Sequence, residues 1–251
     1  MPLPSDPAFG RLTTDSLFRA LRRGWELFVR TRPLSVSYAM IFAVVGVIIL
    51  VAIERASFAP MIFPLTGGFM FVGPLLLSGF FAIADRVARG EKTSFSDVVS
   101  GFSRTSREML ILAFVCALLF IVWIADTAML YGFLVGRTPT SLLVLLSPSD
   151  DVATFLVWSS LLGAIIAFGI FTISAFSVPL LYYRRAGLAR AVRLSIAAVF
   201  ANLVPSLLWA MFLSVTIIVS ILIFPLFLMT FPVLAFASHA LYRELFPESR
   251  V

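Results

Sequence analysis

Apolar runs longer than a bilayer core is thick are the feature that most constrains the fold of this chain. Residues 34–53 contain no charged side chain, and neither do residues 205–242. A helix of about 20 apolar residues crosses the roughly 30 Å hydrocarbon core of a membrane. Only 13% of the chain is charged, whereas soluble domains average about 25%. The sequence therefore predicts an all-α, polytopic membrane protein.

We expect six transmembrane helices. Their expected bounds are 34–53, 61–84, 109–130, 155–183, 205–223 and 226–243. As one helix the last two would be about 58 Å long, and Pro225 between them suits a tight turn. No charged residue marks that turn, so one long helix, and hence five spans, stays open as an alternative. An N-terminal segment (1–33) precedes this membrane domain (34–243), and a short tail (244–251) follows it.

Basic residues are distributed unevenly among the loops that this topology creates. If the N-terminus is cytoplasmic, 17 of the 19 Lys and Arg residues lie on the cytoplasmic side, and only Arg55 and Arg137 lie outside. Cytoplasmic loops carry such an excess of Lys and Arg. We therefore expect a multi-pass protein of the bacterial inner (cytoplasmic) membrane with both ends in the cytoplasm. Topology accounts for the net charge of +6, so we expect no nucleic-acid partner. The first residues lack the apolar core of a signal peptide, so the first span is expected to direct insertion.

Residues 14–30 have the pattern of an amphipathic helix. Apolar side chains recur at helical spacing: Leu17, Leu21, Trp25 and Phe28. Basic side chains fill much of the rest: Arg19, Arg22 and Arg23. A basic helix that carries a Trp is typical of the membrane interface, and docking on a protein partner is the alternative. Arg184 and Arg185 are further candidates for basic residues at the cytoplasmic interface.

A proline recurs in the even-numbered spans, at Gly73–Pro74, Pro179 and Pro232. Each is followed by an apolar run and then by an arginine, and an amphipathic segment lies upstream of each pair of spans. We therefore expect three hairpins, each preceded by a cytoplasmic interfacial helix, as three copies of one unit with kinks at the three prolines. The kinks could line a transport path or form tight packing joints. Proline is also common in transmembrane helices in general.

Four stretches of the chain resemble a known family. They are GPLLLSGFFAIADRVARGE at 73–91, Gly24–Trp25, VPLL at 178–181 and ASHALYREL at 237–245. The resemblance is to a bacterial integral membrane family catalogued as a domain of unknown function, family 2189, and it extends over nearly the whole chain. It implies a multi-span inner-membrane protein without an established chemistry.

The sequence offers little material for catalysis or for a cofactor. His239 is the only histidine and Cys116 the only cysteine, which excludes haem ligation by two histidines and a cysteine-based metal site. The motifs of phosphate-binding loops, nucleophile elbows and zinc proteases do not occur. We therefore expect no enzymatic activity, no cofactor and no metal.

Two ionisable residues lie near the ends of expected spans. His239 is near the cytoplasmic end of span 226–243, and Asp126 is near the outer end of span 109–130. An ionisable group within a membrane is a functional candidate, but a group near a span end reaches the interface at small cost. We favour structural roles for both; the alternative is a proton relay for Asp126, and a ligand or a proton relay for His239.

The most favoured function is a non-catalytic accessory or scaffold subunit of a larger membrane complex, such as a respiratory complex. The 26 Phe residues suit broad packing against lipid or a protein partner. A small channel or transporter for a small solute or anion is the first alternative, with a pathway near the three prolines. A role in lipid or envelope homeostasis is the second. The expected partners are the lipid bilayer and either another membrane protein or further copies of this chain.

Overall fold

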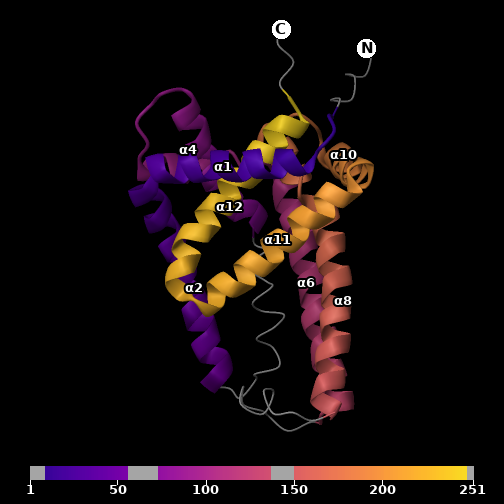
Figure 1. Cartoon of the computed structure of the whole chain (residues 1–251). Helices are drawn as coiled ribbons and strands as arrows, with labels where there is room; N and C mark the ends of the chain where they lie inside the picture. The colour runs from indigo at the N-terminus through magenta and orange to yellow at the C-terminus, as the bar shows by residue number, and fades with distance from the viewer. Residues whose placement is uncertain (1–8, 56–72, 137–149, 248–251) are drawn as a thin grey trace.

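The computed structural model describes residues 9–55, 73–136 and 150–247, and every element in these ranges is a helix (Figure 1). In chain order they are α1 (Thr14–Arg30), α2 (Arg32–Arg55), α4 (Gly73–Ala88), α5 (Phe95–Ser103), α6 (Arg107–Leu134), α8 (Asp150–Ser174), α9 (Ser177–Tyr182), α10 (Leu188–Ala201), α11 (Leu203–Leu222) and α12 (Phe224–Leu245). This confirms the expected helical class. The first part of the expected span 61–84 lies outside the described residues.

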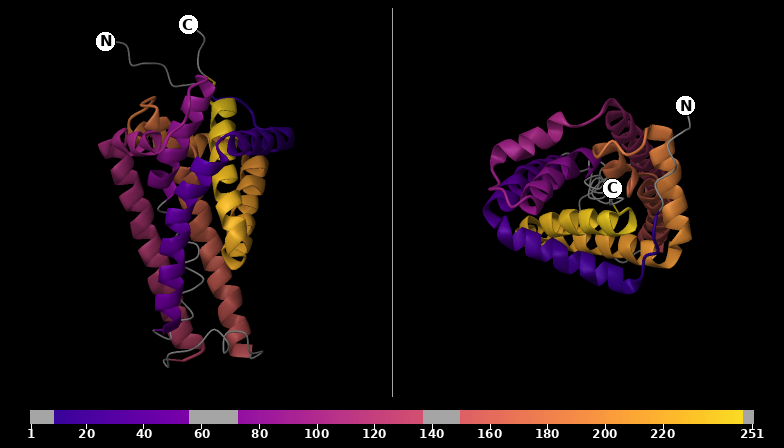
Figure 2. Two further views of the ribbon diagram at one scale, coloured as in Figure 1. Left: turned by 90° about the vertical axis from the view of Figure 1, so that its left-hand side faces the viewer. Right: turned by 90° about the horizontal axis from the view of Figure 1, so that it is seen from above.

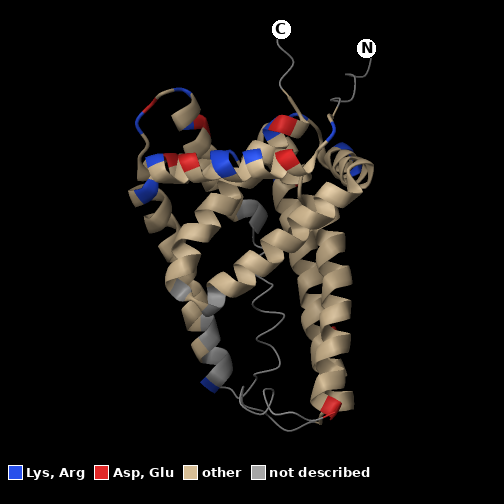
Figure 3. Cartoon of the chain, in the orientation of Figure 1, with Lys and Arg blue, Asp and Glu red and all other residues tan. Residues whose placement is uncertain are grey.

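Charged side chains gather at one end of the bundle (Figure 3). Both ends of the described chain meet there, because the Gly10 N–H donates to the Leu245 carbonyl at 2.8 Å and the Phe9 and Phe246 rings lie 6.0 Å apart. We call this the charged end. At the opposite end, α2 finishes and α8 begins.

Four described segments are long and apolar enough to cross a membrane. They are Arg107–Leu134, Asp150–Tyr182, Leu203–Ser220 and Pro225–Leu245. The pair α1 and α2 would be a fifth, but the chain bends by 100° between them. Such a bend means that α2 can cross while α1 lies along the surface. The six-span count is therefore not confirmed over the described residues.

The apolar run 205–243 forms two helices, as expected. α11 and α12 are separated by a single residue, Ile223, and Pro225 lies in the first turn of α12. Both helices run obliquely, and in two views their junction lies well short of the far ends of α6 and α8 (Figures 1 and 2). The expected spans five and six therefore form a tilted hairpin that turns back before the level reached by the other long helices.

α1 lies across the charged end, and its apolar face packs against the rest of the protein. Leu17 and Phe28 are buried where α1 packs along α12. A Cβ on Gly24 would lie only 2.6 Å from the Val233 carbonyl oxygen, so the two helices cross in close contact there. A neighbouring stripe, containing Phe18 and Trp25, is exposed. Within the expected apolar face, Leu17 and Phe28 therefore contact the protein, whereas Trp25 stays exposed beside Phe18.

Two further short helices lie ahead of long ones, in the way that α1 lies ahead of α2: α5 precedes α6, and α10 precedes α11. This order agrees with the expected unit of an interfacial helix and a hairpin. Equivalent kinks are not confirmed, because α12 continues unbroken through Pro232, whereas the chain breaks ahead of Pro179. The residues that precede Gly73–Pro74 lie outside the described ranges. The threefold repeat stays a prediction.

The break between α8 and α9 is bridged by a side chain from α10. Pro179 has no N–H to donate to the carbonyl four residues earlier, and its ring pushes that carbonyl away. Within the break, the Ser195 hydroxyl donates to the Thr172 carbonyl at 2.8 Å and accepts from the Phe176 N–H at 3.2 Å. A buried serine hydroxyl therefore replaces one backbone hydrogen bond of the helix, that between the Phe176 N–H and the Thr172 carbonyl.

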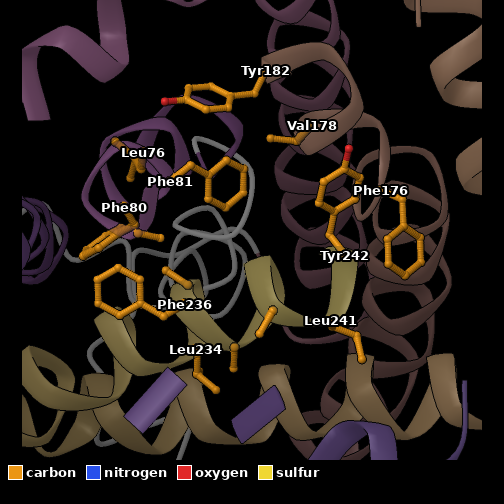
Figure 4. Close-up of a cluster of buried hydrophobic side chains, with 14 of the residues drawn as sticks. Leu76, Phe80, Phe81, Phe176, Val178, Tyr182, Leu234, Phe236, Leu241 and Tyr242 are labelled. Atoms are coloured by element: carbon orange, nitrogen blue, oxygen red, sulfur yellow. The ribbon is translucent and has the colours of Figure 1, made fainter. Parts of the chain in front are cut away.

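α12 is the central helix of the charged half. In the apolar stretch of α12, 61% of residues are buried, compared with 22% in the apolar stretches of α6 and of α11. Its Phe236 packs edge-on against Phe80 of α4 at 5.4 Å between ring centroids, and the surrounding cluster unites α4, α9 and α12 (Figure 4). α6 and α11 therefore leave most of their surface for lipid, while α12 brings neighbouring helices together.

Candidate functional site

Three helical segments place a hydrogen-bonded chain of ionisable side chains at the charged end. Asp85 lies in the last turn of α4, Tyr183 caps the C-terminus of α9, and His239 lies in α12. The Tyr183 hydroxyl donates to Asp85 Oδ1 at 2.8 Å. The same hydroxyl lies 2.8 Å from His239 Nε2. Three residues from distant parts of the sequence thus form one continuous chain.

The chain has two arrangements that differ by one proton. With Asp85 ionised, Tyr183 donates to the carboxylate, so its oxygen accepts a hydrogen from His239 Nε2. With Asp85 protonated, the carboxyl group can donate to Tyr183, whose hydrogen then turns to an unprotonated Nε2. In this second arrangement His239 is the Nδ1–H tautomer, and transfer of the Asp85 proton to Tyr183, with the Tyr183 hydrogen moving to Nε2, gives an ionised Asp85 and an imidazolium. Such a chain can bind and pass on a proton.

Aromatic rings enclose this chain. The Tyr183 ring is nearly parallel to those of Phe81 (16° between planes, centroids 6.4 Å apart) and Tyr242 (3°, 5.8 Å). Phe81 also contacts the His239 ring at 5.3 Å, and His239 is only 8% exposed. Figure 4 shows the rings of Phe81 and Tyr242 on α4 and α12. Apolar walls of this kind limit water and strengthen the hydrogen bonds inside.

Burial and charge act on Asp85 in opposite directions. Burial raises the pKa of its carboxyl group, because desolvation disfavours the charged form. The hydrogen bond from Tyr183 and the positive charges of Arg243, Arg104 and Arg89 lower the pKa by smaller amounts. The net pKa is raised above the usual value for aspartate. Asp85 therefore takes up a proton more readily than an exposed aspartate would.

The turn after α9 holds Tyr183 in place. The Arg185 N–H donates to the Leu180 carbonyl at 2.9 Å and the Arg184 N–H to the Leu181 carbonyl at 3.1 Å, the pattern of a Schellman motif. Arg184 has a left-handed backbone with φ of 52°, a position that usually favours glycine. The turn fixes the C-terminal end of α9, and with it the position of Tyr183.

Arg185 has a structural role in this turn. Its guanidinium donates to the Phe246 carbonyl at 2.7 Å and to the Pro247 carbonyl at 3.0 Å. These bonds attach the end of α12 to the segment after α9. Arg185 thus faces the protein, whereas Arg184 is exposed.

The three basic candidates on α1 are exposed and form ion pairs. Arg19 lies 2.5 Å from Glu244 and Arg23 lies 3.9 Å from the same carboxylate. Arg22 pairs with Glu26 within α1 at 3.1 Å. Exposed pairs of this kind contribute little to stability, but the two contacts with Glu244 fix α1 to the end of α12.

The remaining candidates divide into two groups. Pro179 and Pro232 precede Tyr183 and His239 in the chain by about one and two helical turns, and Gly73 and Pro74 belong to α4, the helix of Asp85. Asp126 is half-buried in α6, roughly 30 Å along the helix from its charged end. The structure therefore brings His239 into the chain and leaves Asp126 apart from it.

Sequence reasoning identified His239 but missed Asp85 and Tyr183. Asp85 directly follows the expected span 61–84, and Tyr183 is the last residue of the expected span 155–183. The available signal was the repeat itself, because each of the three proline-containing segments carries an ionisable side chain before its first arginine: Asp85 in AIADR, Tyr183 in LYYR and His239 in SHALYR.

Comparison with protein families supports the expected membership for one part of the chain. Residues 62–182 match the family described as "Predicted integral membrane protein (DUF2189)". This segment belongs to that family, and the protein is an integral membrane protein. The match covers just under half of the chain and includes Asp85, while Tyr183 and His239 lie beyond it. No curated protein and no solved structure matches the chain.

Proposed function

We propose that this protein is a small channel or transporter that carries protons, with Asp85, Tyr183 and His239 as its proton-binding group. The observation that carries the proposal is the pair of 2.8 Å hydrogen bonds that join the three residues. They lie on separate helical segments, so a change of protonation acts on three segments at once. Ionisable residues that face the interior of a membrane-protein bundle commonly mark proton relays.

Two features of the backbone support a transport role. The helix that leads to Tyr183 is broken between α8 and α9, and broken helices are the usual sites of binding in transporters. The tilted hairpin of α11 and α12 turns back within the bundle (Figure 1). Tyr183 and His239 each belong to one of these irregular parts, so a proton there can influence both.

The proposal includes an orientation. Lys and Arg residues gather at the charged end (Figure 3), and basic residues are retained on the cytoplasmic side. The charged end therefore faces the cytoplasm of a bacterial cell, with both chain ends on that side. The proton-binding group then exchanges with the cytoplasm, and the protein needs no enzymatic activity or cofactor for this role.

The accessory or scaffold role, with another membrane protein or further copies of the chain as partner, stays a prediction. Large apolar side chains such as Phe114 and Phe133 of α6 are exposed, and lipid or a partner would cover them equally well. A role in lipid or envelope homeostasis also stays a prediction.

The test is proton flux in vesicles. The purified protein is reconstituted into liposomes that contain a pH-sensitive dye, and a potassium diffusion potential drives proton entry. We expect faster acidification than in protein-free vesicles, and a loss of most of this flux in Tyr183→Phe and Asp85→Asn. Removing a positioned proton donor or acceptor typically costs about 10²- to 10⁴-fold in proton-transfer rate.

The matched control is Tyr182→Phe. Tyr182 is the adjacent buried tyrosine, and its hydroxyl lies outside the hydrogen-bonded chain. We expect this variant to keep its flux. Equal rates in wild-type and protein-free vesicles would overturn the proposal, and so would equal losses in Tyr183→Phe and Tyr182→Phe.

A further inference from the structure

The helix α1 has two apolar faces, and only one of them is covered by the protein. The first contains Leu17 and Phe28 and is buried where α1 packs along α12. The second lies next to it around the helix and is exposed: Phe18 is 67% exposed, Trp25 45% and Val29 46%. These three residues are 7 and 4 positions apart, so they form one row along the helix.

The third face of α1 is charged. All its side chains are exposed, and they are Asp15, Arg19, Arg22, Arg23, Glu26 and Arg30. At about 100° per residue, the buried, exposed apolar and charged faces follow one another around the helix, and each takes roughly a third of its circumference. An ordinary surface helix has two faces, one toward the core and one toward water, so the exposed apolar face requires a third environment.

The exposed apolar face is turned toward the side on which the long helices lie. α1 runs from right to left across Figure 1 in front of α12, and α2 descends from its left-hand end (Figures 1 and 2). Since the buried face is turned back toward α12, the right-handed sense of the helix places the exposed apolar face below and the charged face above. The 100° bend between α1 and α2 holds α1 across the direction of the long helices.

Below α1, neighbouring helices expose apolar surface of the same kind. α2 exposes Val44 and Ile48, at 49% and 62%, and α11 exposes Met211 and Val215, at 60% and 54%. In a membrane protein such surface meets the lipid chains. The exposed face of α1 therefore lies at the upper border of the lipid-facing surface, where Trp is typically found.

We propose that α1 lies in the surface of the lipid leaflet at the charged end, with Phe18, Trp25 and Val29 inserted below the headgroups. α12, lipid and water would then each cover one face of α1. Lipid is favoured over a protein partner because the exposed face points toward the bilayer and the charged face points away from it. The proposal depends only on insertion in a bilayer, not on proton transport.

The experiment measures the depth of single side chains. In a Cys116→Ala background, Phe18→Cys and Val29→Cys of the full-length protein each carry a nitroxide spin label in phosphatidylcholine vesicles. Collisions of the label with oxygen, which concentrates in hydrocarbon, are compared with collisions with a water-soluble nickel chelate. We expect a several-fold higher ratio of oxygen to nickel collisions at these positions than at the controls. This ratio should correspond to a depth of about 5–10 Å.

The controls are Glu26→Cys and Arg30→Cys, which lie on the charged face and are also exposed. Their labels should collide mainly with the nickel chelate. Equal ratios on the two faces would overturn the proposal, because both would then face the same medium. Few collisions with either reagent at Phe18→Cys and Val29→Cys would also overturn it, since a protein partner or a second copy would then cover the face. If labelled Phe18→Cys is misfolded, Trp25→Cys takes its place in the same comparison.

Discussion

At the scale of a residue, the Tyr183 hydroxyl links the hydrogen bonding of Asp85 to that of His239. It has a single hydrogen and two strong partners, Asp85 and His239, each at 2.8 Å. It can donate to only one of them at a time, so the protonation of one partner fixes the hydrogen-bonding role of the other. Tyr183→Phe would separate the two ionisable groups while leaving the stacked ring in place.

The raised pKa of Asp85 predicts a pH dependence of stability. Its folded pKa lies above its unfolded value, so between these two values the folded protein binds more protons than the unfolded chain. Stability is therefore fully retained below the ordinary aspartate pKa of about 4 and falls as pH rises through the folded value. We expect thermal unfolding in detergent to show this fall, and Asp85→Asn to remove it.

A matched control is Glu91→Gln. The hydrogen bonds from Arg89 and Arg86 lower the pKa of the exposed Glu91 carboxyl, so its contribution has the opposite sign and is present at higher pH. This variant should keep the fall that Asp85 causes. A pH profile of Asp85→Asn identical to that of the wild type would contradict the assignment.

At the scale of the element, the break between α8 and α9 depends on a partner from a third helix. An isolated break would leave the Thr172 carbonyl and the Phe176 N–H buried without partners, and Ser195 satisfies both. Ser195 is itself fully buried. The irregular backbone is therefore stable only when α10 is docked.

Ser195→Ala should destabilise the protein by about 1–3 kcal/mol, because two buried backbone groups lose their partner. Ser174→Ala is the control, since Ser174 bonds only to the Ile170 carbonyl within its own helix, and its effect should stay within roughly 0.5 kcal/mol. Unfolding in mixed micelles with increasing denaturing detergent measures both. Similar midpoints for the two variants would argue against the bridge.

At the scale of the whole molecule, the hairpin of α11 and α12 gives the same topology whether it enters the membrane partly or crosses it fully. Both of its ends lie toward the charged end whether or not its tip crosses the membrane, so the 17-to-2 division of basic residues is the same in either case. Its turn leaves little backbone unpaired, because the Ile223 N–H donates to Val219 at 3.1 Å and Pro225 has no N–H. Such a turn can remain in the bilayer core.

Cysteine accessibility would test this depth. In a Cys116→Ala background, we expect Arg55→Cys, at the exposed far end of α2, to react with a membrane-impermeant maleimide added to intact cells. Ile223→Cys is also exposed on the protein surface but should not react, because lipid covers it. Equal labelling at both positions would mean that the hairpin crosses completely.

The sequence by itself determined the membrane class and the position of α1, and it favoured the division of 205–243 into two helices while one long helix stayed open. These follow from local quantities: the length of apolar runs, a proline at a turn and a helical period. Each depends on whether a segment faces lipid or water, and the types and spacing of its residues indicate this directly.

Only the tertiary structure decided which apolar face of α1 is buried, how deep the hairpin of α11 and α12 reaches, and which side chains meet. Asp85, Tyr183 and His239 are 98 and 56 residues apart in the chain, and a one-dimensional pattern does not specify their contact. Helix packing decides it, because close crossings such as that at Gly24 fix the helices in one arrangement. For the same reason, the sequence favours only a packed role for His239, whereas the fold makes it one member of a hydrogen-bonded chain that can bind a proton.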